Sequence, residues 1–227
     1  REKVTLWTRK ESSSFLVVRS VCDAFGPDSK EDCGRPKEFA ATLKGAKNFL
    51  QPYRGNRFNI PFENATAVFH HHPAILEYIG SLERNQKNQL LVSVEADLLD
   101  PIVVGGIRAM GILERHVTSP LYKMVACPGI NIIESSQYYS HLETKLKEWI
   151  SDPADLMDGS ARLFEDFPPV QDDLYNSLYR VEEGDRMCTL TQYALTVLLI
   201  VSLMILQRQA PEHLPGGRYH PAVLKEK

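Results

Sequence analysis

Three consecutive histidines, His70, His71 and His72, are the residues whose type best suits metal binding. Imidazole is a common metal ligand, but a metal site needs several ligands that converge on one point. Consecutive side chains of an α-helix point about 100° apart, so these three rings cannot face one ion. We therefore expect no metal here and interpret the run as an exposed helix end before Pro73.

Two pairs of acidic residues have the chemistry of a divalent-cation site. Glu95 with Asp97, or Asp152 with Asp155, could hold a metal ion as nucleases and transposases do. Their spacing does not distinguish them from acidic residues on solvated helix faces or at helix N-termini, which is the simpler interpretation. The sequence therefore predicts no metal ligand.

Motifs of nucleophilic or phosphate-transfer enzymes are absent from the sequence. No Gly-x-Ser-x-Gly elbow and no phosphate-binding glycine loop occurs; Gly105-Gly106 and Gly216-Gly217 are typical of close helix packing and of a helix stop. We expect no catalytic residue, no cofactor and no enzymatic activity of the chain by itself.

A small basic and aromatic cluster could contact nucleic acid. Arginine and lysine bind phosphates, and aromatic rings stack on bases. The cluster interleaves Tyr53 and Phe58 with the candidate nucleic-acid-binding residues Lys44, Lys47, Arg54 and Arg57. Four charges over this length are also common on an ordinary surface.

Composition indicates a globular protein rather than a specialised class. Of the 227 residues, 43% are hydrophobic and 24% are charged, which excludes disordered and collagen-like chains. The formal net charge of −3 does not favour overall electrostatic binding to nucleic acid or to an anionic membrane.

The cysteines and the N-terminus favour an intracellular protein, in the nucleus or cytoplasm. Cys22, Cys33, Cys127 and Cys188 form neither a disulfide framework nor a zinc-site spacing, so we expect reduced thiols. No charged and then apolar leader follows Arg1, although the chain could be a fragment.

The elements that would position these residues are mainly helical, and we expect an irregular multi-helix bundle with a less regular N-terminal segment. Residues 1–60 form that segment, in which the apolar run around Val17 and Val18 fits a strand or a short helix. Residues 61–150 repeat apolar positions at three- and four-residue steps and predict a helical domain. Within it Pro73 must kink or split one segment, and we expect a helix pair.

The second half begins with the clearest helix and ends with the most apolar one. The first has an amphipathic face of Tyr138, Tyr139, Leu142, Leu146, Trp149 and Ile150. Residues 151–185 are rich in Asp and Glu and predict an exposed acidic connector. Residues 186–219 predict an apolar helix with a stop, packed on the helical domain.

The stretch from Met187 to Leu206 contains no charge and has two interpretations. About twenty residues match a hydrocarbon core of roughly 30 Å, which favours a single-span membrane anchor. Thr191, Gln192 and Ser202 lower its hydrophobicity, and no aromatic belt follows beyond Tyr193, which favours a core helix. We prefer the core helix and keep the membrane as the alternative.

Short motifs over residues 16–219 resemble a group of animal proteins derived from DNA transposons. They include Cys22-Asp23-Ala24-Phe25, Asp32-Cys33-Gly34, Arg54-Gly55-Asn56-Arg57-Phe58-Asn59, Arg108-Ala109-Met110-Gly111, Val117-Thr118-Ser119-Pro120-Leu121, Phe164-Glu165-Asp166-Phe167-Pro168 and Leu214-Pro215-Gly216-Gly217-Arg218-Tyr219. Such proteins are distantly similar to hAT-type transposases, whose RNase H-like catalytic domain is interrupted by a helical insertion.

The resemblance implies that this chain is the helical part of such a protein. The acidic triad of those enzymes needs a carboxylate on an early strand, and no strand-rich early half is present, so no catalytic residue is carried over. We expect a non-catalytic scaffold that binds protein, itself or DNA. The alternatives are a fragment of a metal-dependent transposase or nuclease, and the single-span membrane protein.

Overall fold

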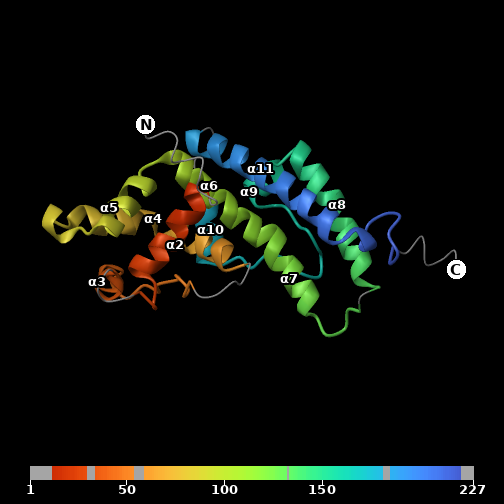
Figure 1. Ribbon diagram of the computed structural model, residues 1–227, viewed down its shortest axis with the longest axis horizontal. Coiled ribbons are helices and arrows are strands. Elements are labelled where there is room, and N and C mark those ends of the chain that lie inside the picture. The colour runs from red at the N-terminus through yellow and green to blue at the C-terminus, as the bar shows by residue number, and fades with distance from the viewer. Residues whose placement is uncertain (1–11, 30–33, 54–58, 132, 181–184, 221–227) are drawn as a thin grey trace. The chain divides into compact units, whose positions relative to one another are not determined.

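The computed structural model of the chain describes residues 12–29, 34–53, 59–131, 133–180 and 185–220. Within these ranges every regular element is a helix, which confirms the mainly α-helical fold (Figure 1). The chain divides into two compact units, Arg1–Gly111 and Ile112–Lys227. This division differs from the boundaries expected after residues 60, 150 and 185, because the helices before residue 60 pack against those between residues 60 and 98.

The first unit is built around its first described helix. It contains α2 (Ser13–Phe25), α3 (Pro36–Thr42), α4 (Ile60–Ser81), η1 (Arg84–Gln86), α5 (Gln89–Leu98) and most of α6 (Pro101–Leu113). The apolar run around Val17 is therefore a helix, and the Ser12 hydroxyl caps it by accepting a hydrogen bond from the Phe15 N–H at 3.3 Å. Helix α2 packs against α3, α4 and α5.

Aromatic rings from three of these helices form the centre of the first unit. The ring of Phe25 lies 4.9 Å from that of Phe39 and 5.8 Å from that of Tyr78, measured between centroids. All three side chains are buried. The segment 1–60, expected to be irregular, thus supplies two helices and part of a packed core, because its apolar residues recur on one side of α2.

Helix α4 continues through Pro73, so the predicted helix pair is wrong. A proline inside a helix removes one backbone hydrogen bond, but tertiary packing supplies most of the stability of a helix in a protein. Ile75, Tyr78 and Ile79 beyond the proline are buried with Val68 before it. Burial on both sides of Pro73 therefore keeps the helix in one piece.

The second unit follows α6 and contains the most apolar helix. Its elements are the π-helical turn η2 (Glu114–Thr118), α7 (Ser119–Ala126), α8 (Ser135–Ser151), α9 (Ala154–Asp158), α10 (Asp173–Leu178), α11 (Arg186–Gln209) and η3 (Pro211–His213). Helices α8 and α11 lie side by side (Figure 1). The predicted amphipathic helix is confirmed as α8, with Leu142, Leu146 and Trp149 buried.

The segment 151–185 is not the exposed connector that its acidic residues predict. Its described part forms α9 and α10, and it buries Leu156, Ala161, Leu163, Phe164, Tyr175 and Leu178. The ring of Phe164 packs edge-on against Tyr138 of α8 at 5.1 Å. The apolar residues between the acidic ones are therefore enough to fold this segment onto the second unit.

Candidate functional site

Helix α11 begins at a defined cap and is long and apolar. The Asp185 carboxylate accepts a hydrogen bond from the Met187 N–H at 3.2 Å, which satisfies one of the free donors of the first turn. The helix has 24 residues, and no charged residue occurs between Met187 and Leu206. By length and composition it could cross a membrane.

Helix α11 is buried along one face only. Four of its 24 residues are buried. The buried residues, Thr191, Leu195, Leu199 and Leu206, follow one another at steps of four and seven and form one stripe. The sequence favours a core helix packed on residues 61–150; α11 does pack on α8 of that range, but by this one stripe.

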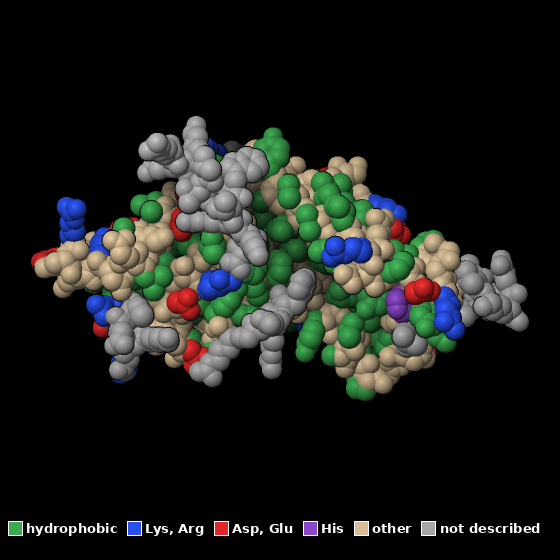
Figure 2. Space-filling model, viewed as in Figure 1, with side chains coloured by type: hydrophobic (Ala, Val, Ile, Leu, Met, Phe, Trp, Pro, Cys, Tyr) green, Lys and Arg blue, Asp and Glu red, His purple; other side chains and the backbone are tan. Residues whose placement is uncertain are grey.

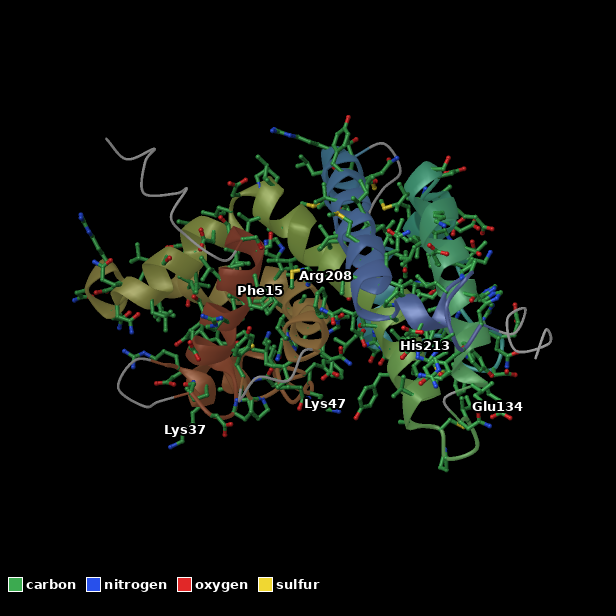
Figure 3. All side chains as sticks on the ribbon, turned by 45° about the vertical axis from the view of Figure 1, so that its right-hand side comes forward. Phe15, Lys37, Lys47, Glu134, Arg208 and His213 are labelled. Atoms are coloured by element: carbon green, nitrogen blue, oxygen red, sulfur yellow. The ribbon has the colours of Figure 1, made fainter. Side chains whose placement is uncertain are left out.

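Polar contacts fix α11 antiparallel to α8. Near the end of α11, the Gln207 amide donates a hydrogen bond of 2.9 Å to Glu143 in α8. Just after α11, His213 Nδ1 lies 2.8 Å from the hydroxyl of Ser136 in the first turn of α8. Figure 3 shows His213 close to the start of α8, which Glu134 marks. The hydrogen bond from Gln207, and then Lys147, lowers the pKa of the Glu143 carboxyl.

The opposite face of α11 is apolar and exposed. Five residues form what we call the apolar seam: the half-buried Leu190 and the exposed Tyr193, Val197, Ile200 and Met204. Tyr193 is 70% exposed, Val197 59% and Met204 63%. Val201 and Ile205, beside the seam, are exposed as well. Figure 2 shows hydrophobic side chains gathered on the surface over α11. Large exposed apolar patches are typical of binding surfaces.

Two hydroxyl groups within α11 are satisfied by the helix itself. Thr191 Oγ1 donates to the carbonyl oxygen of Met187 at 2.7 Å, and Thr196 Oγ1 donates to that of Gln192 at 2.9 Å. A hydroxyl that is already bonded costs less to remove from water. These threonines therefore do not prevent another surface from covering α11.

A buried histidine and a tyrosine form a short polar contact in the second unit. His116 is 0% exposed. The carbonyl of Ala161 can only accept, so the proton is on His116 Nδ1, which donates at 2.9 Å. Burial lowers the pKa of His116 to about 4, so the ring is neutral and Nε2 accepts from the Tyr179 hydroxyl at 2.6 Å. The pair therefore ties η2 to the chain after α9 and to the end of α10.

A hollow of about 460 Å³ opens beside this pair, between α9 and α10. Tyr175 and Tyr179 form its apolar part, and Asp158 and Arg180 are among its polar lining. His116 lies behind Tyr179 with no exposed surface, so its base nitrogen reaches no solute. We therefore assign His116 a structural role: it connects η2 to Ala161 and Tyr179.

A serine and a histidine, a combination found in nucleophilic enzymes, also come together at the end of α11. Ser136, which contacts His213, is 0% exposed. The Ser140 hydroxyl donates to the backbone carbonyl of His213 at 3.0 Å. Both hydroxyls therefore attach η3 to α8, and a buried hydroxyl such as that of Ser136 has no access to a substrate.

The histidine run is not the exposed helix end that the sequence predicts. His71 is buried, and its Nε2 accepts a hydrogen bond from the Phe49 N–H at 3.1 Å. His72 Nε2 donates to the carbonyl of Leu98 at 2.9 Å. Burial, and then the neighbouring His70, lowers the pKa of His71 to about 4. The run thus connects α4 to its neighbours in the first unit.

One residue of each acidic pair takes part in a local contact. Glu95 forms an ion pair of 2.8 Å with Lys87. Asp152 accepts a hydrogen bond from the Ala154 N–H at 3.0 Å. In the part of the chain that the structure describes, no three His, Cys, Asp or Glu side chains are grouped so that they could hold a metal ion.

The basic cluster is only partly described. Lys44 and Lys47 are exposed after α3, and the Lys47 ammonium lies 5.1 Å from the ring centroid of Phe49. Arg54 and Arg57 lie outside the described residues.

Sequence reasoning missed the apolar seam, although its signal is present. The steps of three, four, three and four residues from Leu190 to Met204 are those of a helix that packs along a partner helix. The buried residues Leu195 and Leu199 are equally apolar, so the helix has no polar face. Without a polar face, the sequence does not distinguish the covered side from the exposed one.

No protein-family model, no curated protein and no solved structure matches this chain. The resemblance to hAT-type transposases therefore rests on the short motifs.

Proposed function

We propose that this chain is a non-enzymatic helical scaffold that binds a protein partner through the apolar seam of α11. One observation carries the proposal: a 24-residue apolar helix packs by one face and leaves the other face exposed. Covering about five large apolar side chains removes a substantial area from water, at roughly 25 cal/mol per Å² of that area. The seam thus provides the driving force for binding.

Further support comes from how the reactive side chains are used. His116 and Ser136 have no exposed surface, and Glu95 is ion-paired with Lys87. These side chains stabilise helix contacts and do not converge on an open cleft. A scaffold accounts for them better than a fragment of a metal-dependent nuclease, which needs carboxylates grouped around one point.

We also propose that the scaffold derives from the helical part of a hAT-type transposase and acts inside the cell. The motifs from Cys22 to Tyr219 support this origin, and the helices of the described residues agree with what the resemblance implies. DNA contact through Lys44, Lys47, Arg54 and Arg57 is a secondary part of the same proposal. Lys44 and Lys47 are exposed, which supports it.

Photo-cross-linking in cells tests the binding surface. A photoreactive amino acid replaces Val197, in the middle of the seam, and the control replaces Gln192, which is exposed on α11 outside the seam. We expect protein adducts from position 197 and few or none from position 192. Equal labelling from both positions, or no protein adduct from position 197, would contradict the proposal.

Membrane insertion is the second candidate, and the hydropathy of α11 favours it. The packing of α8 opposes a simple span: α8 runs along α11 and carries Glu143, Lys145 and Lys147, charges that cost energy inside a bilayer. Alkaline extraction of cell membranes separates the two functions. A scaffold is released by extraction, whereas an integral membrane protein stays in the pellet and labels lipid from position 197.

A further inference from the structure

The apolar seam has the spacing of a coiled-coil contact surface. Leu190, Val197 and Met204 are seven residues apart, and Tyr193 and Ile200 occupy the positions three residues after the first two. This is the a and d pattern of helices that pack along each other through interlocking side chains. At 3.6 residues per turn, the seam lies about half a turn around α11 from the stripe that packs on α8.

From this spacing we propose that the partner is a second copy of the same chain, which pairs α11 with α11 in antiparallel orientation. The inference rests on the proposed function, because it names the partner of the same surface. Two identical seams match each other in length, spacing and polarity. The arrangement is a two-fold dimer, in which each copy contributes the same residues.

The absence of charged residues along the seam favours self-association. No charged residue occurs between Met187 and Leu206, so two copies bring no like charges together along the contact. The flanking residues Ala194 and Val201 are apolar and would lie at the edges of the contact. Two such faces together bury on the order of 1,000 Å², about the lower limit for a specific interface. We therefore expect a modest, concentration-dependent dimer.

Antiparallel pairing gives well-matched layers. In antiparallel coiled coils, an a position faces a d position of the other helix. Val197 of one copy then faces Ile200 of the other, and Tyr193 faces Met204, while Leu190 faces the polar Gln207 at the edge of the contact. Both layers repeat by the two-fold symmetry. The Tyr193 and Met204 layer also brings a thioether next to an aromatic ring, a favourable contact.

The ends of α11 oppose the parallel arrangement. A parallel pair would place Arg208 beside Arg208 and Arg186 beside Arg186, and would align the two helix dipoles unfavourably. In the antiparallel register above, Arg208 of one copy faces Thr189 of the other, about one helical turn from Asp185. The charges at the ends therefore favour antiparallel pairing.

Sedimentation velocity of the purified chain between about 1 and 100 µM tests the dimer. We expect the weight-average mass to rise from one chain toward two. Val197→Glu should weaken association on the order of 100-fold, because it buries an unpaired charge at the centre of the seam. Gln192→Glu, the same charge on α11 outside the seam, should leave association unchanged. A wild-type chain that stays monomeric throughout this range would overturn the inference.

A charge-pair variant tests the orientation. Tyr193→Lys and Met204→Glu should each prevent association, and the double variant should restore it, because each lysine then faces a glutamate of the other copy. A double variant that stays monomeric overturns the antiparallel arrangement, because a parallel pair places like charges together. Circular dichroism of each variant confirms that the exposed substitutions leave the fold intact.

The outcome also separates this inference from the proposed function. A monomeric wild-type chain that still forms adducts with other proteins from position 197 removes the second copy as partner and retains the scaffold. If Val197→Glu leaves the association of the dimer unchanged, association uses another surface, and this result contradicts the inference.

Discussion

The side-chain amide of Gln207 donates a 2.9 Å hydrogen bond to Glu143, which ties the last turns of α11 to the middle of α8. The same carboxylate accepts from Lys147 at 2.9 Å, one turn further along α8. Together with the contacts of His213, this bond fixes which face of α11 is covered. The location of the apolar seam follows from that choice.

Introducing a charge should therefore lower the free energy of unfolding at one residue of α11 and leave it nearly unchanged at the adjacent residue. Leu199 is 0% exposed and Ile200 is 42% exposed. Leu199→Asp places an unpaired charge against α8 and should lower the free energy of unfolding by about 3 kcal/mol or more. Ile200→Asp should change it by less than about 0.5 kcal/mol in the dilute monomer. Urea unfolding followed by circular dichroism measures both, and equal losses would contradict the one-sided packing of α11.

Acid should destabilise the fold through two histidines. Burial lowers the pKa of His71 and of His116 from 6.5 to about 4. Protonation therefore favours the unfolded chain, and the stability present above pH 6.5 is lost as the pH falls toward 4. Each histidine contributes up to about 3 kcal/mol to this loss. Urea unfolding at pH 7, 5.5 and 4.5 measures it.

The variant His116→Asn provides the control for the acid effect. It keeps a side chain that hydrogen-bonds but does not titrate, so its stability should depend less on pH between 6.5 and 4. A pH dependence identical to that of the wild type would show that His116 is not protonated on unfolding in this range.

The hydroxyl of Tyr179 should contribute measurably to stability. Tyr179→Phe removes the donor to the buried Nε2 of His116 and should cost about 1 to 2 kcal/mol. Tyr122→Phe removes a hydroxyl from a side chain that is 65% exposed and should cost almost nothing. Thermal unfolding of the two variants measures the difference, and equal melting temperatures would count against the His116 and Tyr179 contact.

Two glycines in helical regions should respond oppositely to alanine. Gly159 has φ = +83°, and an added Cβ would lie 2.8 Å from the Tyr175 hydroxyl oxygen. Gly159→Ala should therefore cost about 2 kcal/mol or more. Gly80, in α4, has no neighbour within 4 Å of an added Cβ, and Gly80→Ala should stabilise by up to about 1 kcal/mol. A neutral Gly159→Ala variant would show that the turn after α9 adapts.

The predictable part of the fold is the part with a clear polar face. Helix α8 carries the exposed Lys147 and Glu148 on the side away from the buried Leu142 and Leu146, so its period indicated both the helix and its buried side. The break between α5 and α6 was also predictable, because Pro101 suits a first helical position.

Other features depend on tertiary packing that no local pattern reports. Pro73 predicts a break, but burial of Ile75 and Ile79 beyond it keeps α4 continuous. The many acidic residues of 151–185 predict an exposed segment, but the apolar residues between them are buried and fold the segment onto the second unit. In α11 both faces are apolar, so only the position of α8 decides which side remains for a partner.

A photo-cross-linking scan along α11 tests the central claim most directly. The photoreactive residue is placed in turn at the exposed positions from Gln192 to Gln209, and protein adducts are quantified. The binding surface predicts strong labelling at positions 193, 197, 200 and 204, with steps of four, three and four, and weak labelling at 192 and 209. Uniform labelling around the helix, or adducts with lipid only, would contradict a protein-binding seam.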